Sequence, residues 1–401
     1  MAEAARARPA PLHRGLPDEI SIWEILVRLP PKALLRCRSV CRAWRRATST
    51  RDFLLAHHGH QPALPLLYEQ NSTLSVDIIP LDHRAGVATA DKLHSVARLG
   101  FGETYMHLQA SCDGLLILST ESHSSVSRPL HFSVCSPATR QYAPLPLLRG
   151  FGLAGMYPHP PTGEYRLLLY PDAALTVDER PSGVQDACYL YALGSCQPPR
   201  HIGWPEVEVL IHAIAPALFR GSLHWHIEQE EWRSNMIMAF DTTTELFRQM
   251  HAPAVPDDAD LFEMDGVLSM ASFSDATIDI WTMQDYDCEV WAFKFRVELP
   301  TAELRVRFGF SLYNSDVAVS SWDDDVLILV QSGEWLLQID IAGKLVSSFH
   351  RKFLSTSKFR LKQTLVQHTF FPTLEGYAVN TWPFISLDDS VVNTPSEACS
   401  V

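Results

Sequence analysis

Two patterns of apolar and polar positions divide the chain near residue 60. Before it, apolar side chains recur at helical spacing in short runs separated by prolines. After it, short runs rich in β-branched, aromatic and leucine residues lie between Gly, Pro, Asn and Asp, a pattern typical of strands joined by turns. The clearest runs are 114–120, 164–170, 188–194, 222–228, 267–273, 277–283, 289–295 and 325–331. We therefore expect a small helical unit followed by a large all-β unit.

The first helix is predicted to begin at Ile22. Ser21 and Glu24 have the spacing of a capping box, in which the hydroxyl accepts from the Glu24 amide and the carboxylate accepts from the Ser21 amide. Pro30 and Pro31 end this helix, because a proline ring excludes the helical conformation of the residue before it. Pro31 can also open the next helix. The apolar stripe of the first helix is Ile22, Ile25, Leu26 and Leu29.

Residues 36–46, RCRSVCRAWRR, place five arginines around one tryptophan. On a helix the apolar side chains of residues 37–48 fall within an arc of about 120°, with Trp44 among them. The opposite arc carries Arg38, Arg42, Arg45 and Arg46, and a break near Ser39 would leave this segregation intact from residue 40 onward. Single-stranded nucleic acid is bound by aromatic side chains set among cations. The two are separated here, which favours a solvated cationic face and no nucleic-acid partner.

Charge also changes near residue 60. Residues 1–60 hold 11 basic and 5 acidic side chains, and the remaining 22 basic and 41 acidic side chains give the rest a net charge of −19. The longest apolar runs are far shorter than the ~18 residues of a membrane span, and residues 1–15 have no apolar signal region. The eight cysteines are scattered, as in reduced proteins. We expect no membrane partner and a location in the cytoplasm or the nucleus.

A weak repeat organises the β-rich part. A Gly before an apolar strand, followed by a strand with a short turn, recurs at Gly114, Gly221 and Gly266. The second and third glycines are 45 residues apart and the first two are 107 apart, which corresponds to two units. Kelch-like blades have a period of about 50 residues. At that period the remaining chain predicts a β-propeller of about six blades.

Residues 16–58 resemble an F-box. The matching elements are Leu16-Pro17, Ile25-Leu26, Arg28-Leu29-Pro30, Leu34-Leu35, Val40-Cys41, Trp44, Phe53 and His57. The stretch from Leu-Pro to Ile-Leu is one residue longer than the commonest spacing, and Ser21 is a candidate for the extra residue. The resemblance implies that the apolar stripes bind a Skp-type adaptor, which bridges to a cullin scaffold and its RING subunit. The implied adaptor-binding residues are Leu16, Pro17, Ile22, Ile25, Leu26, Leu29, Pro30, Leu34, Leu35, Val40, Cys41 and Trp44.

The β-rich part resembles the F-box-associated, kelch-like region of plant F-box proteins. Residues 134–146 resemble its Asn-Pro-Ala-Thr-Arg turn, with Ser136 in place of Asn. Residues 157–170 and 239–253 resemble two further segments of that region. The resulting fold is an α+β multidomain chain, in which a three-helix F-box precedes an all-β propeller. Its expected parts are a disordered lead (1–13), the F-box (14–60), the propeller (61–375) and a partly disordered tail (376–401).

No catalytic constellation is evident. The GFGLAG of 150–155 fits a dinucleotide motif, but prolines on both sides favour an inter-blade loop. The spacing of Cys37, Cys41, His57, His58 and His60 loosely imitates a zinc finger, and we expect buried thiols instead. His224 and His226 share one strand face, where packing or a polar rim is expected. We therefore expect no metal and no cofactor.

The leading hypothesis is a non-catalytic substrate receptor of a Skp–cullin–F-box ubiquitin ligase, whose propeller holds an unknown target protein. Two alternatives stay open: an adaptor-bound scaffold outside any ligase, and a propeller hydrolase or lectin. The acidity beyond residue 60 suggests that a basic target segment is attracted to an acidic rim. The candidates for target binding are Asp323, Asp324 and Asp325.

Overall fold

The computed structural model divides into two compact units. The helical unit comprises residues 1–62 with 363–366, and the propeller unit comprises 63–362 with 367–401. Among the helices that the structure describes, none is long and apolar enough to cross a membrane. The described residues are 18–71, 75–81, 95–100, 104–122, 131–145, 148, 150–171, 187–203, 215–227, 236–253, 258–274, 276–309, 316–322, 325–379 and 384–386.

The helical unit is built from short helical segments. In chain order they are α1 (Asp18–Ile20), the π-helix η1 (Ser21–Ile25), the 3-10 helix η2 (Leu26–Arg28), α2 (Pro31–Cys37), α3 (Arg42–Ala47) and α4 (Arg51–His60). The predicted capping box is wrong, because the helical turns begin at Asp18 and Ser21 lies inside them. The carboxylate of Glu24 instead accepts from Arg28, one turn later, at 3.1 Å. Pro31 opens α2 as predicted.

The π-helical turn η1 explains the unusual spacing at the start of this unit. A π-turn closes its hydrogen bond over one more residue than an α-turn does, and such turns behave as single-residue insertions in a helix. The sequence from Leu-Pro to Ile-Leu is one residue longer than the commonest F-box spacing, and η1 ends at Ile25, the first residue of that Ile-Leu pair. The extra residue is therefore accommodated within the helix rather than in a loop.

A buried cluster holds the helical segments together. Leu26, Val27, Leu34 and Phe53 are at most 3% exposed. The main-chain carbonyl of Leu29, just before the two prolines, accepts from His57 Nε2 at 2.8 Å and from Gln61 Nε2 at 3.1 Å. These bonds satisfy a carbonyl at the end of η2 that has no partner further along a helix.

The expected break near Ser39 separates α2 from α3. Cys41 caps α3, since its Sγ accepts from the Trp44 amide at 3.4 Å. Arg38 does not belong to the solvated face that was predicted for it, because its Nη2 donates to the Thr48 carbonyl at 2.5 Å. Arg42, Arg45 and Arg46 are exposed, in agreement with the predicted cationic face.

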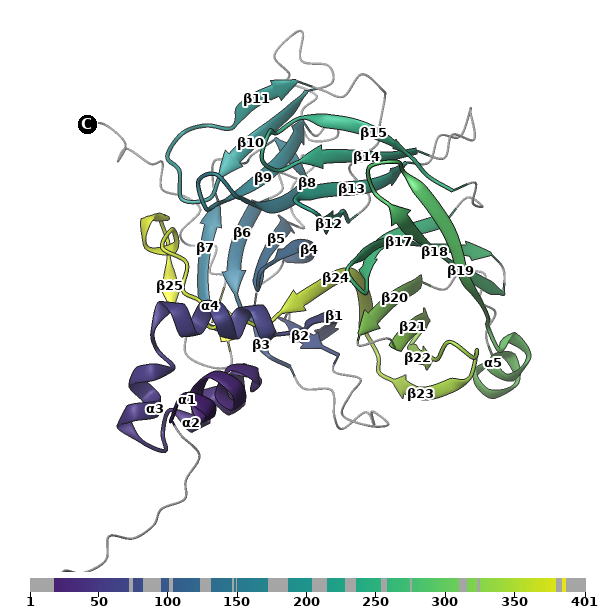
Figure 1. The fold of residues 1–401 in the computed structure, drawn as a ribbon, viewed down its shortest axis with the longest axis horizontal. Coiled ribbons are helices and arrows are strands. Elements are labelled where there is room, and N and C mark those ends of the chain that lie inside the picture. The colour runs from purple at the N-terminus through teal and green to yellow at the C-terminus, as the bar shows by residue number, and fades with distance from the viewer. Residues whose placement is uncertain are drawn as a thin grey trace, which may run out of the picture. The chain divides into compact units, whose positions relative to one another are not determined.

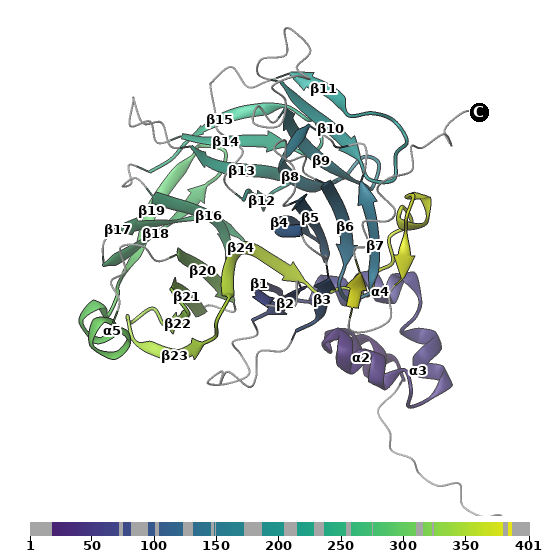
Figure 2. The ribbon, with the colours of Figure 1, turned by 180° about the vertical axis from the view of Figure 1, so that it is seen from behind.

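Six sheets are arranged as the blades of a propeller (Figures 1 and 2), which confirms the predicted fold. Blade 1 consists of β24 (Leu354–Lys362), β1 (Ala63–Asn71), β2 (Ser75–Pro80), β3 (Ala97–Gly100) and β26 (Phe384–Ser386). Blade 2 consists of β4 (Thr104–Cys112), β5 (Leu115–Ser122), β6 (His131–Ser136), β7 (Gln141–Leu145) and β25 (Ala378–Val379). Blade 3 consists of β8 (Phe151–His159), β9 (Glu164–Pro171), β10 (Cys188–Ala192) and β11 (Arg200–Gly203).

The other three blades follow in chain order. Blade 4 consists of β12 (Ala217–Phe219), β13 (Ser222–Ile227), β14 (Met236–Asp241) and β15 (Phe247–His251). Blade 5 consists of β16 (Asp258–Met264), β17 (Val267–Ser274), β18 (Thr277–Asp285) and β19 (Val290–Glu298). Blade 6 consists of β20 (Asp316–Trp322), β21 (Asp325–Ser332), β22 (Trp335–Ile339) and β23 (Leu345–His350). Two further helices are α5 (Thr301–Phe308) and the 3-10 helix η9 (Phe371–Thr373).

Blade 1 closes the ring by joining strands from distant parts of the chain. Its strand order is β24-β1-β2-β3-β26, so the late strand β24 pairs with β1, where Leu64 lies opposite Leu361. Two short strands from the expected tail also pair with the propeller: β25 adds to β7, and β26 runs parallel to β3. Closure removes the open sheet edges that a linear row of blades would leave.

The glycine repeat marks the turn between the first and second strands of three blades. The two turn residues are Asp113-Gly114 in blade 2, Arg220-Gly221 in blade 4 and Asp265-Gly266 in blade 5, and all six have positive φ angles. Two-residue hairpin turns of type I′ need positive φ at both positions, which glycine adopts at little cost. This requirement produces the repeat that is visible in the sequence.

The core is divided among the junctions between blades. Each of six apolar clusters joins two neighbouring blades, including blade 6 to blade 1. Inner strands are consequently buried on both faces; Leu223 and Trp225 of β13 pack toward blade 3, while His224 of the same strand contacts Tyr286 of blade 5. This two-sided burial explains why the strands lack a strict alternation of apolar and polar residues.

Candidate functional site

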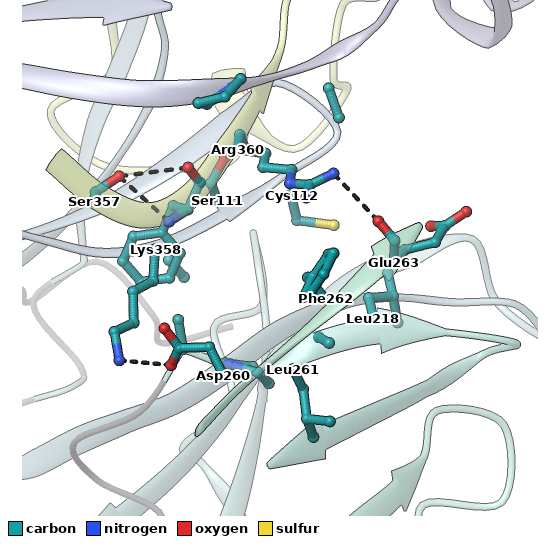
Figure 3. A pocket seen from close by; sticks show the side chains of 18 of the residues that line it. Ser111, Cys112, Leu218, Asp260, Leu261, Phe262, Glu263, Ser357, Lys358 and Arg360 are labelled. Carbon is teal, nitrogen blue, oxygen red and sulfur yellow. Dashed lines mark hydrogen bonds and ion pairs between the residues drawn. The ribbon is translucent and has the colours of Figure 1, made fainter. Parts of the chain in front are cut away.

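The central channel of the propeller unit is a cavity of about 310 Å³ that is lined by strands of all six blades. The first strand of every blade, β24, β4, β8, β12, β16 or β20, contributes residues to its wall. Polar and charged side chains from β4, β16 and β24 reach this wall together with apolar ones such as Phe262 (Figure 3). A mixed lining of this kind is typical of ligand sites, in which a few polar groups orient a partner.

Strand β24 brings three cations to the channel. Lys358, Arg360 and Lys362 alternate along the strand and all line the cavity. Alternate residues of a strand share one face, about 6.5 Å apart. On the other face Leu361 is buried against blades 1 and 2; Phe359 packs against the same cluster and also touches the cavity. The packing of the apolar residues therefore directs the cations inward.

Lys358 and Arg360 have different partners for their positive charges. Lys358 Nζ lies 2.6 Å from Asp260 Oδ1 of β16. The half-buried guanidinium of Arg360 donates to two main-chain carbonyls, Glu263 at 3.5 Å and Val319 at 3.4 Å (Figure 3 shows the first). Its Cζ lies 6.0 Å from the centre of the Phe262 ring. Burial lowers the pKa of Arg360 from its usual value, since a charged group loses hydration there.

Two serines fix the backbone of β24 at the channel wall. Ser111 of β4 donates to the Arg360 carbonyl at 2.6 Å, and Ser357 donates to the Leu66 carbonyl at 2.8 Å. These bonds tie β24 to blade 2 and to its own blade. The side chain of Arg360 therefore projects from a backbone that is held from both sides.

Most of the glycine-rich segment 150–155 belongs to strand β8 and not to an inter-blade loop, and its last residue, Gly155, lines the channel. No helix follows the segment, so a dinucleotide site is excluded there. A Cβ on Gly152 would lie 2.2 Å from the Tyr170 ring, and one on Gly155 would lie 2.9 Å from Leu223. Close packing, rather than a turn, is the reason for these glycines.

The predicted adaptor-binding residues fall into three groups. Leu26 and Leu34 are buried, which gives them a role in the core of the helical unit. Leu16 and Pro17 lie outside the described residues. Cys41 is exposed and Cys37 half-buried, so the expectation of buried thiols is wrong at Cys41. The remaining predicted residues are exposed or half-buried: Ile22, Ile25, Leu29, Pro30, Leu35, Val40, Cys41 and Trp44.

The helical unit exposes three large apolar residues that the sequence prediction did not include: Ile20, Trp23 and Leu55. The predicted stripe assumed regular α-helical spacing from residue 22. The π-turn η1 changes that phase and leaves Ile20, Trp23 and Ile25 each more than 40% exposed. The longer spacing before Ile25 was the signal in the sequence that could have indicated this change.

The acidic target-binding candidates are not tested. Asp323 and Asp324 lie outside the described residues, and only the backbone of Asp325, at the start of β21, is described. A further acidic residue, Asp260 of β16, lies in the channel beside Lys358. The sequence prediction missed β24, although its KFRLK alternation is a signal for a strand with one cationic face.

The two strand histidines are packing residues. His224 and His226 are buried in β13, and His224 Nε2 lies 2.8 Å from the Tyr286 hydroxyl. Burial lowers the pKa of His224 to about 4. No group of three or more potential metal ligands occurs in the part of the chain that the structure describes.

Comparison with known proteins matches both units. Residues 14–58 match an F-box-like family, and residues 87–313 match the F-box associated beta propeller domain. F-box protein At5g49610 of Arabidopsis thaliana is 28% identical over 69% of this chain and 77% of its own length. Putative F-box/kelch-repeat protein At1g13200 of the same plant is 24% identical over 88% and 90%.

Solved structures resemble the chain more distantly. A chain of a nidogen/laminin complex aligns with a TM-score of 0.45 and 14% identity, covering 72% of this chain and 95% of that chain. A prolyl endopeptidase aligns with a TM-score of 0.34 and 12% identity, covering 79% and 54%. Neither likeness carries an argument about function.

Proposed function

The chain belongs to the plant F-box proteins that carry an F-box associated beta propeller domain, and from this premise we propose that it is the substrate-recognition subunit of a Skp–cullin–F-box ubiquitin ligase. The helical unit binds a Skp-type adaptor, which bridges to the cullin and its RING subunit. The propeller holds a target protein. The chain itself performs no covalent step, and it accelerates ubiquitin transfer by raising the effective concentration of the target.

The exposed apolar surface of the helical unit carries this proposal. Six large apolar side chains there are more than 40% exposed, and Val40 reaches 68%. Large apolar side chains exposed together on so small a unit favour an interaction surface there, since large exposed apolar patches mark interaction sites in soluble proteins. The six are Ile20, Trp23, Ile25, Leu35, Val40 and Leu55.

The same proposal places the protein in the cytoplasm or the nucleus. The described cysteines are Cys37, Cys41, Cys112, Cys135, Cys188, Cys196 and Cys288, and all of them are free thiols. Free thiols suit the reducing cytoplasm and nucleus, where cullin-based ligases would meet this chain.

Reconstitution with purified adaptor, cullin and RING subunit tests the proposal. The full chain should retain the adaptor and, through it, the cullin, whereas Leu35→Asp with Val40→Asp should lose both. Val306→Asp is the matched control, because Val306 is 89% exposed on α5 of the propeller unit. Equal adaptor binding by all three proteins, or none by the wild type, would contradict the proposal. Adaptor binding that excludes the cullin would favour a scaffold outside a ligase.

Target identification needs proximity labelling in cells. The wild-type chain and the Leu35→Asp, Val40→Asp variant should label the same target proteins, because both have the same propeller. Those targets should become ubiquitinated only in cells that contain the wild-type chain, because the variant does not bind the adaptor. The expected preference for a basic target segment, which would involve Asp323, Asp324 and Asp325, stays a prediction for that stage.

A further inference from the structure

The channel holds more cationic charge on β24 than its described contacts neutralise. Lys358 has the Asp260 carboxylate at 2.6 Å. Arg360 can donate five hydrogen bonds, yet among the described residues its guanidinium reaches only two carbonyls, at 3.5 and 3.4 Å. Lys362 forms no ion pair within the described part of the chain. A half-buried guanidinium with long bonds retains donors for a further acceptor.

The two other acidic residues on the channel wall, Asp113 and Glu263, form no described side-chain hydrogen bond to Arg360. Asp113 accepts from the Tyr165 hydroxyl of blade 3 at 3.2 Å. Glu263 contacts Arg360 through its main-chain carbonyl, and its side chain is exposed. The Glu263 charge still favours the protonated guanidinium, against the effect of burial. Arg360 is therefore a cation whose strongest possible contact, a paired carboxylate or phosphate, is absent among the described residues.

We propose that Arg360 and Lys362 form an anion-binding site in the central channel, which takes a carboxylate or phosphate group of the target. The identity of the ligand as a target group rests on the proposed function; the anion site itself does not. The two cations lie on one face of β24, and the fork of guanidinium donors suits the paired oxygens of either group. Phe262 beside Arg360 and the apolar wall supply contacts for the rest of the entering segment.

Calorimetric titration of the full chain tests the site without a known target. The probes are inorganic phosphate and acetate, each at an ionic strength held constant with sodium chloride. The wild type should bind at least one probe saturably. Arg360→Gln should weaken binding by about tenfold or more, because hydrogen bonds to charged groups contribute at about that level. Arg305→Gln removes the same charge from an exposed position on α5 and should leave binding unchanged.

A second variant, in which anion affinity should increase, tests the site independently if Arg360→Gln disturbs folding. Asp260→Asn removes the carboxylate that compensates Lys358, so phosphate or acetate should bind several-fold more tightly. Saturable binding by phosphate alone would identify a phosphate site, and binding by acetate a carboxylate site. Absence of saturable binding, equal binding by Arg360→Gln, or no gain in Asp260→Asn would overturn the proposal.

Adaptor binding separates failure of this proposal from failure of the proposed function. The channel variants leave the helical unit unchanged, so each should still retain the adaptor. A chain that binds adaptor but neither anion would overturn only the anion site. A chain that binds anion but no adaptor would overturn the ligase role and leave the site standing.

Discussion

Arg38 closes the connection between α2 and α3 by donating to Thr48. Its Nη2 lies 2.5 Å from the Thr48 carbonyl and its Nε lies 3.2 Å from the Thr48 hydroxyl. That hydroxyl donates in turn to the Trp44 carbonyl at 2.7 Å. A cation at the last carbonyls of a helix satisfies acceptors that the helix leaves unpaired. One arginine of the basic cluster is thus structural.

Arg38→Ala should destabilise the helical unit by about 1–3 kcal/mol, since it leaves two acceptors of the buried Thr48 without their charged donor. Hydrogen exchange of residues 42–60 in the full chain measures this as faster exchange. Arg42→Ala with Arg46→Ala should leave exchange unchanged and alter only the salt dependence of adaptor binding. Equal exchange in Arg38→Ala and wild type would contradict a structural role for this arginine.

Neighbouring residues Ile25 and Leu26 should give opposite phenotypes, because Ile25 is 44% exposed and Leu26 is 3% exposed. Ile25→Ala should weaken adaptor binding without changing hydrogen exchange in the free chain. Leu26→Ala should speed exchange throughout the helical unit, since large-to-small changes in a core cost about 2–5 kcal/mol. Adaptor affinity and hydrogen exchange, both measured for each variant, distinguish the two phenotypes.

Combining Leu26→Ala with Trp44→Ala should abolish adaptor binding. One change removes a core residue and the other a half-buried aromatic side chain on the predicted adaptor surface. Retained binding by this double variant, or a larger loss from Arg42→Ala with Arg46→Ala, would mean that the wrong face of the helices had been assigned to the adaptor.

Burial of His224 predicts that the propeller loses stability in mild acid. Its folded-state pKa of about 4 lies below the value of about 6.5 for an unperturbed histidine, so between these pH values the unfolded chain binds the additional proton. The stabilising contribution is full above pH ~6.5 and declines as the pH falls toward 4, by at most roughly 3 kcal/mol.

Urea unfolding followed by circular dichroism between pH 7.5 and 4.5 measures this dependence. His224→Asn should lower stability at neutral pH and flatten its decline in acid. His107→Asn, at an exposed position on β4, should reproduce the wild-type decline. The same decline in all three proteins would show that His224 does not carry the effect.

The sequence predicted the propeller better than the details of its sites. Positive φ angles at Asp265 and Gly266 are a local requirement, so the turn leaves a mark that recurs along the chain. The pairing of β24 with β1 leaves no such mark, since strands nearly 300 residues apart meet only when the ring closes. The inward position of Arg360 depends on that closure and could not be predicted locally.

The helical unit shows the same division. The effect of the prolines that separate the first two helices is local and was predicted. The assignment of the apolar face with Trp44 to the adaptor stays a prediction. Ile25 lies at the surface and Leu26 in the core because the π-turn η1 rotates the residues that follow it. A prediction that assumes 3.6 residues per turn does not include this rotation. Arg38 was misassigned because its partner, Thr48, is brought near only after the chain turns between α2 and α3.

Ring closure by β24 should decide whether the propeller unfolds as one unit. A chain ending at residue 353 lacks the strand that pairs with β1 and contributes Leu354 and Leu361 to the cores at both sides of blade 1. It would expose the edge of β1 and the channel-facing side of the ring, and we expect aggregation or a broad, non-cooperative thermal transition. A chain ending at residue 386 keeps all described strands and should melt cooperatively. Calorimetry of both chains at equal concentration makes the comparison. The shorter chain also lacks β25 of blade 2 and β26 of blade 1. A sharp transition for it would therefore mean that four complete blades and two partial ones are sufficient, and that β24 is not required for the stability of the ring.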